Sequence, residues 1–73
     1  MVDRLSNRLR ELRAEQDLTQ AALAERVGVS RKTINTVENG VFVPSTLLAL
    51  KLARALGLPV EDLFSLDNGA MEN

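Results

Sequence analysis

The stretch TQAALAERVGVSRKTINTVENG, residues 19–40, decides the predicted fold of this chain. It predicts two short helices, because apolar residues recur at helical spacing on each side of Gly28. Thr19 and Ser30 are the expected N-caps of the first and second helix. Gly28 is expected to end the first helix in a left-handed conformation. The remaining linker of about three residues has the length of a helix-turn-helix.

Several positions in and around this stretch match a known family. Ala24 supplies the small side chain needed where the two helices cross, at the expected spacing from Gly28 and Ile34. Over residues 5–66 the sequence resembles the phage-repressor (Cro/cI) type of helix-turn-helix domain, also called the xenobiotic-response-element (XRE) family of transcriptional regulators. The matching positions are Leu18, Thr19, Gln20, Leu23, Ala24, Val27, Gly28, Val29, Ser30, Ile34, Glu38, Asn39, Gly40, Pro44, Ala55, Leu56 and Gly57.

The rest of the chain predicts three more helices and no strand. Leu5, Leu9 and Leu12 have helical spacing in a first helix over residues 1–18, which Asp17 is expected to end in a left-handed conformation. A helix over 46–57 is capped by Ser45, and a short fifth helix follows Pro59. Together with the resemblance, this predicts an all-α, compact five-helix lambda-repressor-like domain over 1–66, with the helix-turn-helix at 19–39 and a flexible tail over 67–73.

Composition excludes several functional classes. Seventy-three residues suffice for one domain, and without cysteine or histidine there is no disulfide, thiolate metal site or imidazole acid–base group. No base–nucleophile pair, phosphate-binding glycine loop or carboxylate cluster is evident, so we expect no enzyme activity, cofactor, metal or small-molecule ligand. No apolar run approaches the ~20 residues of a membrane span. We therefore expect a cytoplasmic protein without membrane contact.

The charge is unevenly distributed along the chain. The net charge of −1 by itself argues against a nucleic-acid partner. Residues 1–57, however, hold nine basic and six acidic residues, a balance of +3, whereas residues 58–73 hold four acids and no base. The low positive charge of the first segment predicts weak non-specific DNA binding.

The second helix of the motif, 31–39, is the expected recognition helix. Ile34 and Val37 should face inward, which leaves polar residues on the outer face. A helix that enters the major groove by its N-terminal end places such residues near base edges. Arginine and lysine suit guanine, asparagine suits adenine, and the threonine methyl suits thymine. The expected base contacts are Arg31, Lys32, Asn35 and Thr36; the alternative is an ordinary solvated helix face.

Other residues are expected to contact phosphate or to stabilise the domain. The resemblance implies that Gln20 and Asn39 reach the DNA backbone, and we also expect phosphate contacts from Ser30 and Arg10. Asn39 has the alternative role of a helix C-cap. The resemblance further implies a structural ion pair between Arg13 and Glu38, and Arg13 lies beside the apolar stripe of the first helix.

Two exposed apolar segments suggest self-association. Val41, Phe42 and Val43 lie in a loop, and Leu47 and Leu50 lie on the side of the fourth helix away from the core stripe. We expect a homodimer contact at Val41, Phe42, Leu47 and Leu50. The alternatives are that Phe42 folds onto the core, or that the dimer forms around Leu58, Val60 and Leu66. The loop also lacks basic residues, which argues against phosphate contacts there.

The predicted function is sequence-specific binding of double-stranded DNA as a transcriptional repressor, by a homodimer that reads a palindromic operator with helix 31–39. An alternative is an antitoxin that regulates its own operon and binds a toxin. A second alternative is a protein-interaction module that does not bind DNA. A salt-dependent gel shift separates the last alternative from the others.

Overall fold

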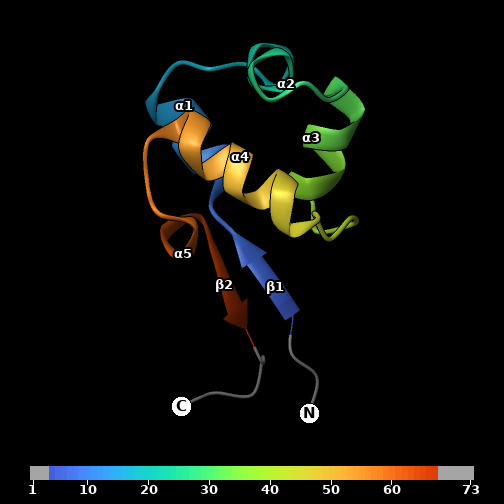
Figure 1. Ribbon diagram of the computed structural model, residues 1–73, viewed down its shortest axis with the longest axis vertical. Coiled ribbons are helices and arrows are strands. Elements are labelled where there is room, and N and C mark those ends of the chain that lie inside the picture. The colour runs from blue at the N-terminus through green and yellow to red at the C-terminus, as the bar shows by residue number, and fades with distance from the viewer. Residues whose placement is uncertain (1–3, 68–73) are drawn as a thin grey trace.

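The computed structural model describes residues 4–67 and contains five helices and a two-stranded sheet. The helices are α1 (Leu9–Glu15), α2 (Gln20–Val27), α3 (Arg31–Glu38), α4 (Thr46–Leu56) and α5 (Val60–Leu63). The strands are β1 (Arg4–Asn7) and β2 (Phe64–Asp67). The helices form one compact body, with α4 running between the α2–α3 pair and α5 (Figure 1).

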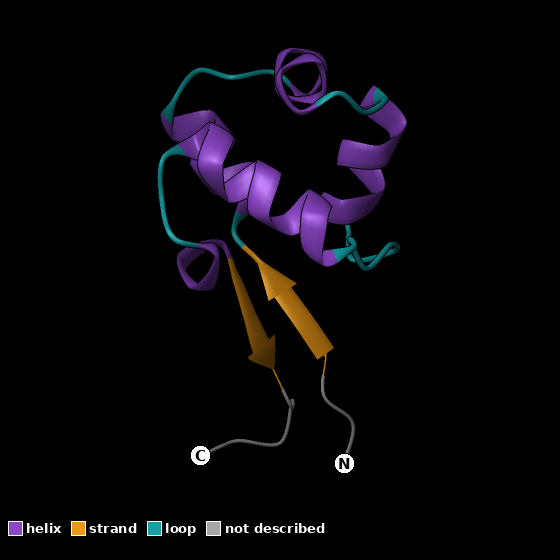
Figure 2. Cartoon of the chain, in the orientation of Figure 1, coloured by secondary structure: helices purple, strands orange, loops and turns teal. Residues whose placement is uncertain are grey.

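The sheet is the main departure from the all-α prediction. β1 and β2 pair antiparallel, with Arg4 opposite Asp67 and Asn7 opposite Phe64. The two strands project from the helical body (Figure 2). The expected helix over 1–18 is therefore wrong at its start, because residues 4–7 find their backbone partners in β2. Asp67, placed in the tail by the sequence, ends β2, and residues 68–73 lie outside the described residues.

Asn7 marks the point where β1 gives way to α1. Its Oδ1 accepts a hydrogen bond of 3.0 Å from the Leu9 N–H, and its Nδ2 donates one of 3.0 Å to the Val37 carbonyl. The Arg8 N–H donates to the Leu63 carbonyl at 3.0 Å. Asn7 thus binds the first turn of α1 and also fastens the strand to the end of α3.

The helix-turn-helix has the predicted caps. The Thr19 side chain accepts from the Ala22 N–H, and the Ser30 side chain accepts from the Thr33 N–H. Gly28 ends α2 with φ of 78°, in the left-handed region where glycine is favoured. Asp17, after α1, also has a positive φ of 53°, as predicted. Caps and turn together fix the angle at which α3 leaves α2.

The core is aliphatic except for Phe64. Leu9, Leu23, Ile34 and Leu52, from four different helices, are fully buried at 0% exposure. Each such side chain contributes roughly 1.5–3 kcal/mol by leaving water. The remaining buried core residues are Leu12, Leu18, Ala24, Val27, Val37, Leu48, Ala53, Leu56, Leu63 and Phe64. The inner face of α3 is therefore anchored, and its outer face is held at the surface.

Candidate nucleic-acid interface

The outer face of α3 carries the four residues predicted to contact bases. Ile34 and Val37 are buried, so the helix can present only its opposite side to a partner. Arg31, Lys32 and Asn35 are exposed there, and Thr36 is half-buried beside them. The structure thus brings these four residues together on one surface. Ser30, at the N-cap, lies at the same end of the helix as Arg31 and Lys32.

The two cations at the start of α3 are free to bind a partner. The side chains of Arg31 and Lys32 make no hydrogen bond or ion pair with any residue in the described part of the chain. Thr36 is different, because its hydroxyl donates to the Thr33 carbonyl at 2.9 Å within the helix. With its hydrogen occupied in this way, Thr36 is left with its methyl group and one acceptor oxygen for outside contacts.

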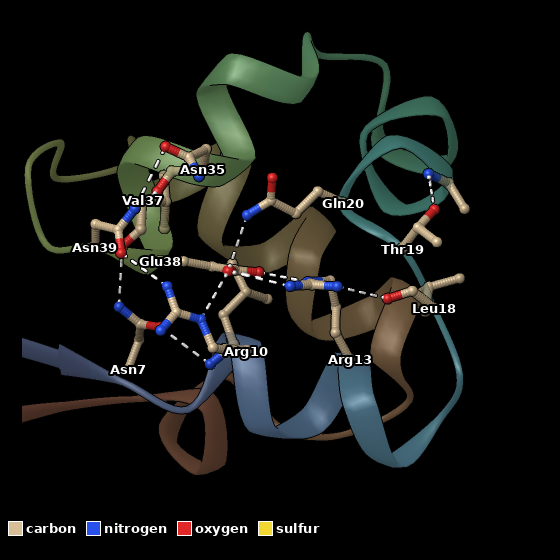
Figure 3. Close-up of polar contacts among 12 residues, drawn as sticks. Asn7, Arg10, Arg13, Leu18, Thr19, Gln20, Asn35, Val37, Glu38 and Asn39 are labelled. Atoms are coloured by element: carbon tan, nitrogen blue, oxygen red, sulfur yellow. Dashed lines mark hydrogen bonds and ion pairs between the residues drawn. The ribbon is translucent and has the colours of Figure 1, made fainter.

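Gln20 and Arg10, two of the predicted phosphate contacts, lie close together at the base of this surface. The Gln20 Nε2 donates to Glu38 Oε1 at 3.1 Å, which uses one of its two hydrogens. The Arg10 side chain is 67% exposed, and its Nε lies 3.5 Å from the same carboxylate oxygen. Figure 3 shows both side chains converging on Glu38 from α2 and α1. Each keeps donor hydrogens available for an anion.

Asn39 lies beside Arg10, but both polar atoms of its amide already have partners. Its Oδ1 accepts from Arg10 Nη2 at 2.8 Å, and its Nδ2 donates to the Asn35 carbonyl at 2.9 Å. A side-chain contact from Asn39 to phosphate would therefore require it to release one of these partners. The C-cap alternative is consistent with the structure, where Asn39 is the C-cap of α3.

Glu38 is the centre of the polar contacts beneath the interface. Its side chain is 0% exposed, so the partial exposure of the residue comes from its backbone. Arg13, whose side chain is 15% exposed, pairs with Glu38 through Nε and through Nη2, the latter 3.2 Å from Oε1. Arg13 Nη1 also donates to the Leu18 carbonyl at 2.8 Å. This pair joins α1, the α1–α2 loop and the end of α3.

The ionisation of Glu38 reflects two opposing effects. Burial acts to raise the pKa of its carboxyl group, because a charge is poorly solvated there. The hydrogen bonds from Arg13 and Gln20 and the charge of Arg13 act to lower it, with a further hydrogen bond from Arg10. The pKa is lowered on balance, so Glu38 is a carboxylate that only accepts hydrogen bonds at neutral pH.

Sequence reasoning missed Asn7 and a second role of Arg10, its contacts with Glu38 and Asn39. Asn7 connects β1 to α1 and α3 through its two hydrogen bonds. Arg10 lies three residues before Arg13, on the same side of a helix, so the spacing was a usable signal that both face Glu38. For Asn7 the signal was absent, since its partner Val37 is thirty residues away.

Apolar side chains are exposed on the loop after α3 and on α4. We call Val41, Phe42, Leu47 and Leu50 the loop–α4 patch; their exposed fractions are 77%, 47%, 65% and 52%. Phe42 is not buried in the core, contrary to the alternative that it folds back. The neighbouring Val43 is exposed as well. Of the alternative dimer residues, Leu58 and Val60 pack partly against the core, and Leu66 is exposed.

Within residues 4–67, no three His, Cys, Asp or Glu side chains are grouped in a way that would hold a metal ion. None of the helices described has the length and apolar character needed to cross a bilayer.

Comparisons with known proteins agree with this geometry. The helix-turn-helix family model matches residues 9–63. An uncharacterised HTH-type transcriptional regulator, YgzD of Bacillus subtilis, is 44% identical over 63 residues, which cover 86% of this chain and 96% of that protein. The cryptic phage CTXphi transcriptional repressor RstR of Vibrio cholerae is 37% identical over 60 residues, 82% of this chain and 54% of the repressor.

A solved structure is also similar to this chain in fold and in sequence. The restriction-modification controller protein C.AhdI from Aeromonas hydrophila superposes with a TM-score of 0.72 at 40% sequence identity. The superposition covers 75% of this chain and 83% of that one.

Proposed function

Because this chain belongs to the helix-turn-helix family of DNA-binding transcriptional regulators, of the Cro/cI (XRE) type, we propose that it is a sequence-specific repressor. In this proposal it binds a palindromic operator as a homodimer and reads the major groove with α3. One observation carries the proposal. The outer face of α3 holds two unpaired cations, Arg31 and Lys32, on a helix whose inner face is buried.

Base reading is assigned to Arg31, Lys32, Asn35 and Thr36. Arginine and lysine donate to guanine O6 and N7, the commonest specific contacts in the major groove. The Thr36 hydroxyl hydrogen is used within the helix, which favours contact between its methyl group and thymine. Phosphate binding is assigned to Gln20, Ser30 and Arg10, which border the same surface and position the helix without reading sequence.

The homodimer is supported by the size of the domain and by its exposed apolar surface. One recognition helix of eight residues covers only a few base pairs, so useful specificity needs two copies on one site. Half-site centres should lie about 34 Å apart, one helical turn of DNA. The loop–α4 patch adjoins α3, so a two-fold contact there would hold the two recognition helices at a fixed spacing.

Repression is proposed from the relatives, of which RstR is named a transcriptional repressor. The proposal is tested by selecting bound sequences from a random DNA pool and titrating the selected duplex, with unrelated DNA as control. We expect a palindromic consensus and affinity that falls with added salt. Equal affinity for selected and unrelated DNA would contradict sequence-specific reading. A co-purifying small protein, with DNA binding retained, would favour the antitoxin alternative.

A further inference from the structure

The side chain of Asn35 is held by a chain of polar contacts that starts at the buried Glu38 carboxylate. Arg10 Nε lies 3.5 Å from Glu38 Oε1, and Arg10 Nη2 donates to Asn39 Oδ1 at 2.8 Å. Asn39 Nδ2 then donates to the Asn35 carbonyl at 2.9 Å and to Asn35 Oδ1 at 3.3 Å. Figure 3 shows these side chains arranged from the first helix to the recognition helix.

Because Arg10 can only donate hydrogen bonds, it determines which end of the Asn39 and Asn35 side-chain amides faces which neighbour. A guanidinium has donors and no acceptor, so Arg10 can meet only the oxygen of the Asn39 amide. The Asn39 nitrogen must then face Asn35, where it donates to the main-chain carbonyl at 2.9 Å and, at 3.3 Å, to Oδ1, the one end of the Asn35 amide that can accept. The free end of the exposed Asn35 side chain is therefore Nδ2, a hydrogen-bond donor.

We infer that Arg10 and Asn39 are positioning residues that make Asn35 a donor toward the bases. This inference rests on the proposed function. An asparagine that prefers adenine uses both ends of its amide, accepting from N6 and donating to N7. In this chain Oδ1 is turned toward Asn39, so that bidentate contact is disfavoured. A lone donor instead selects bases with major-groove acceptors, of which guanine offers two, and rejects cytosine, which offers only a donor.

The inference is tested by the base preference at one operator position. The wild type is titrated against its selected site and all single-base variants at one salt concentration. Asn35→Ala identifies the position, because its preference becomes flat there. At that position the wild type should prefer guanine and bind cytosine at least about fivefold less well, which corresponds to the lower end of the discrimination by a base contact.

Asn39→Asp is the decisive variant. Its carboxylate still pairs with Arg10 and loses the hydrogen bond to the Asn35 carbonyl, but it offers the Asn35 side chain an acceptor. Asn35 should therefore turn Nδ2 inward and Oδ1 outward. The guanine-to-cytosine preference at this position should then fall about fivefold or reverse, while ratios at other positions stay unchanged. The added negative charge weakens all duplexes alike and cancels in these ratios. Arg10→Met removes the residue that can only donate. This variant should bind a duplex with adenine at this position at least as tightly as one with guanine.

Three outcomes would overturn the inference: a wild-type preference for adenine, no position that responds to Asn35→Ala, or folded Asn39→Asp and Arg10→Met variants with the wild-type profile. If the proposed function itself is wrong, the wild type will bind selected and unrelated DNA equally, which distinguishes that result from the three above. Thermal melting confirms that each variant is folded.

Discussion

Glu38 is the residue on which the polar contacts between α1, α2 and α3 converge. Its fully covered side chain accepts from Arg13 and Gln20 and lies close to Arg10. Burial of a carboxylate is tolerable here because donors on several sides replace the lost water. The contacts of Glu38 therefore join α3 to α1 and α2. They also hold Gln20 and Arg10, two of the proposed phosphate-binding residues, in place.

Replacing Glu38 by alanine should strongly destabilise the domain. It leaves Arg13, 15% exposed, without its acid partner, and such a loss costs about 3–5 kcal/mol. Chemical denaturation measures the change in the free energy of unfolding. Glu11→Ala is the matched control, because the Arg8–Glu11 pair is exposed at 51% and 57% and should contribute nothing measurable. Equal midpoints for Glu38→Ala and the wild type would contradict this role.

The pKa of Glu38 also predicts a pH dependence of stability. Its pKa is lowered in the folded state relative to the unfolded chain. The unfolded state therefore takes up the proton first, and the stabilisation present at neutral pH should decrease as the pH falls below about 4.5. Denaturation of Glu38→Gln across this range should show a shallower loss than the wild type. The surface variant Glu11→Gln should keep most of the wild-type acid dependence, and parallel profiles for wild type and Glu38→Gln would contradict the assignment.

At the scale of elements, Asn7 is where the strand, the first helix and the recognition helix meet. Asn7→Ala removes the acceptor for the Leu9 N–H and the donor to the Val37 carbonyl. The expected loss of unfolding free energy is about 1–3 kcal/mol, because two partly buried hydrogen bonds are lost. Asn7→Asp retains the acceptor at α1 and should lose less. If the two variants have the same midpoint in urea, the hydrogen bond from the Leu9 N–H to Asn7 is not the important contact.

The helix-turn-helix and α4 could be predicted from sequence because their signals are local. Thr19, Ser30 and Ser45 cap helices that follow them directly, and Gly28 ends α2 where its left-handed conformation is needed. The sheet could not be predicted in this way. Each strand has four residues, too few for a clear alternation. The two strands pair in space, but all five helices lie between them in the sequence. Leu5 fitted the helical stripe of the first helix while belonging to β1.

For the candidate interface, the sequence predicts which residues of α3 face outward, but not the hydrogen bonds between helices. Burial of Ile34 and Val37 follows from their helical spacing, and it fixes which side chains of α3 face outward. The hydrogen bonds among Arg10, Asn39 and Asn35 join residues up to 29 positions apart. Such contacts depend on how helices pack against one another, which no pattern within a single helix specifies.

At the scale of the whole molecule, the loop–α4 patch predicts self-association. Phe42→Ser and Leu47→Ser each replace an exposed apolar side chain and should shift sedimentation from dimer toward monomer. Because both side chains are exposed, unfolding should change little. Leu66→Ser changes an exposed leucine of β2 that belongs to the alternative dimer contact. If folded Phe42→Ser and Leu47→Ser variants sediment like the wild type while Leu66→Ser dissociates, the dimer contact lies at β2 and not at the loop–α4 patch.

In the proposed complex, α3 reads bases while the residues bordering it hold phosphates. The most direct measurement is a titration of Arg31→Ala, Lys32→Ala and Gln20→Ala against the selected duplex and unrelated DNA at one salt concentration. Arg31→Ala or Lys32→Ala should cost about 1–3 kcal/mol on the selected site and relax preference there, because a base contact is lost. Gln20→Ala should weaken both DNAs by a similar factor. If neither Arg31→Ala nor Lys32→Ala changes binding to the selected site, α3 does not read DNA in this protein.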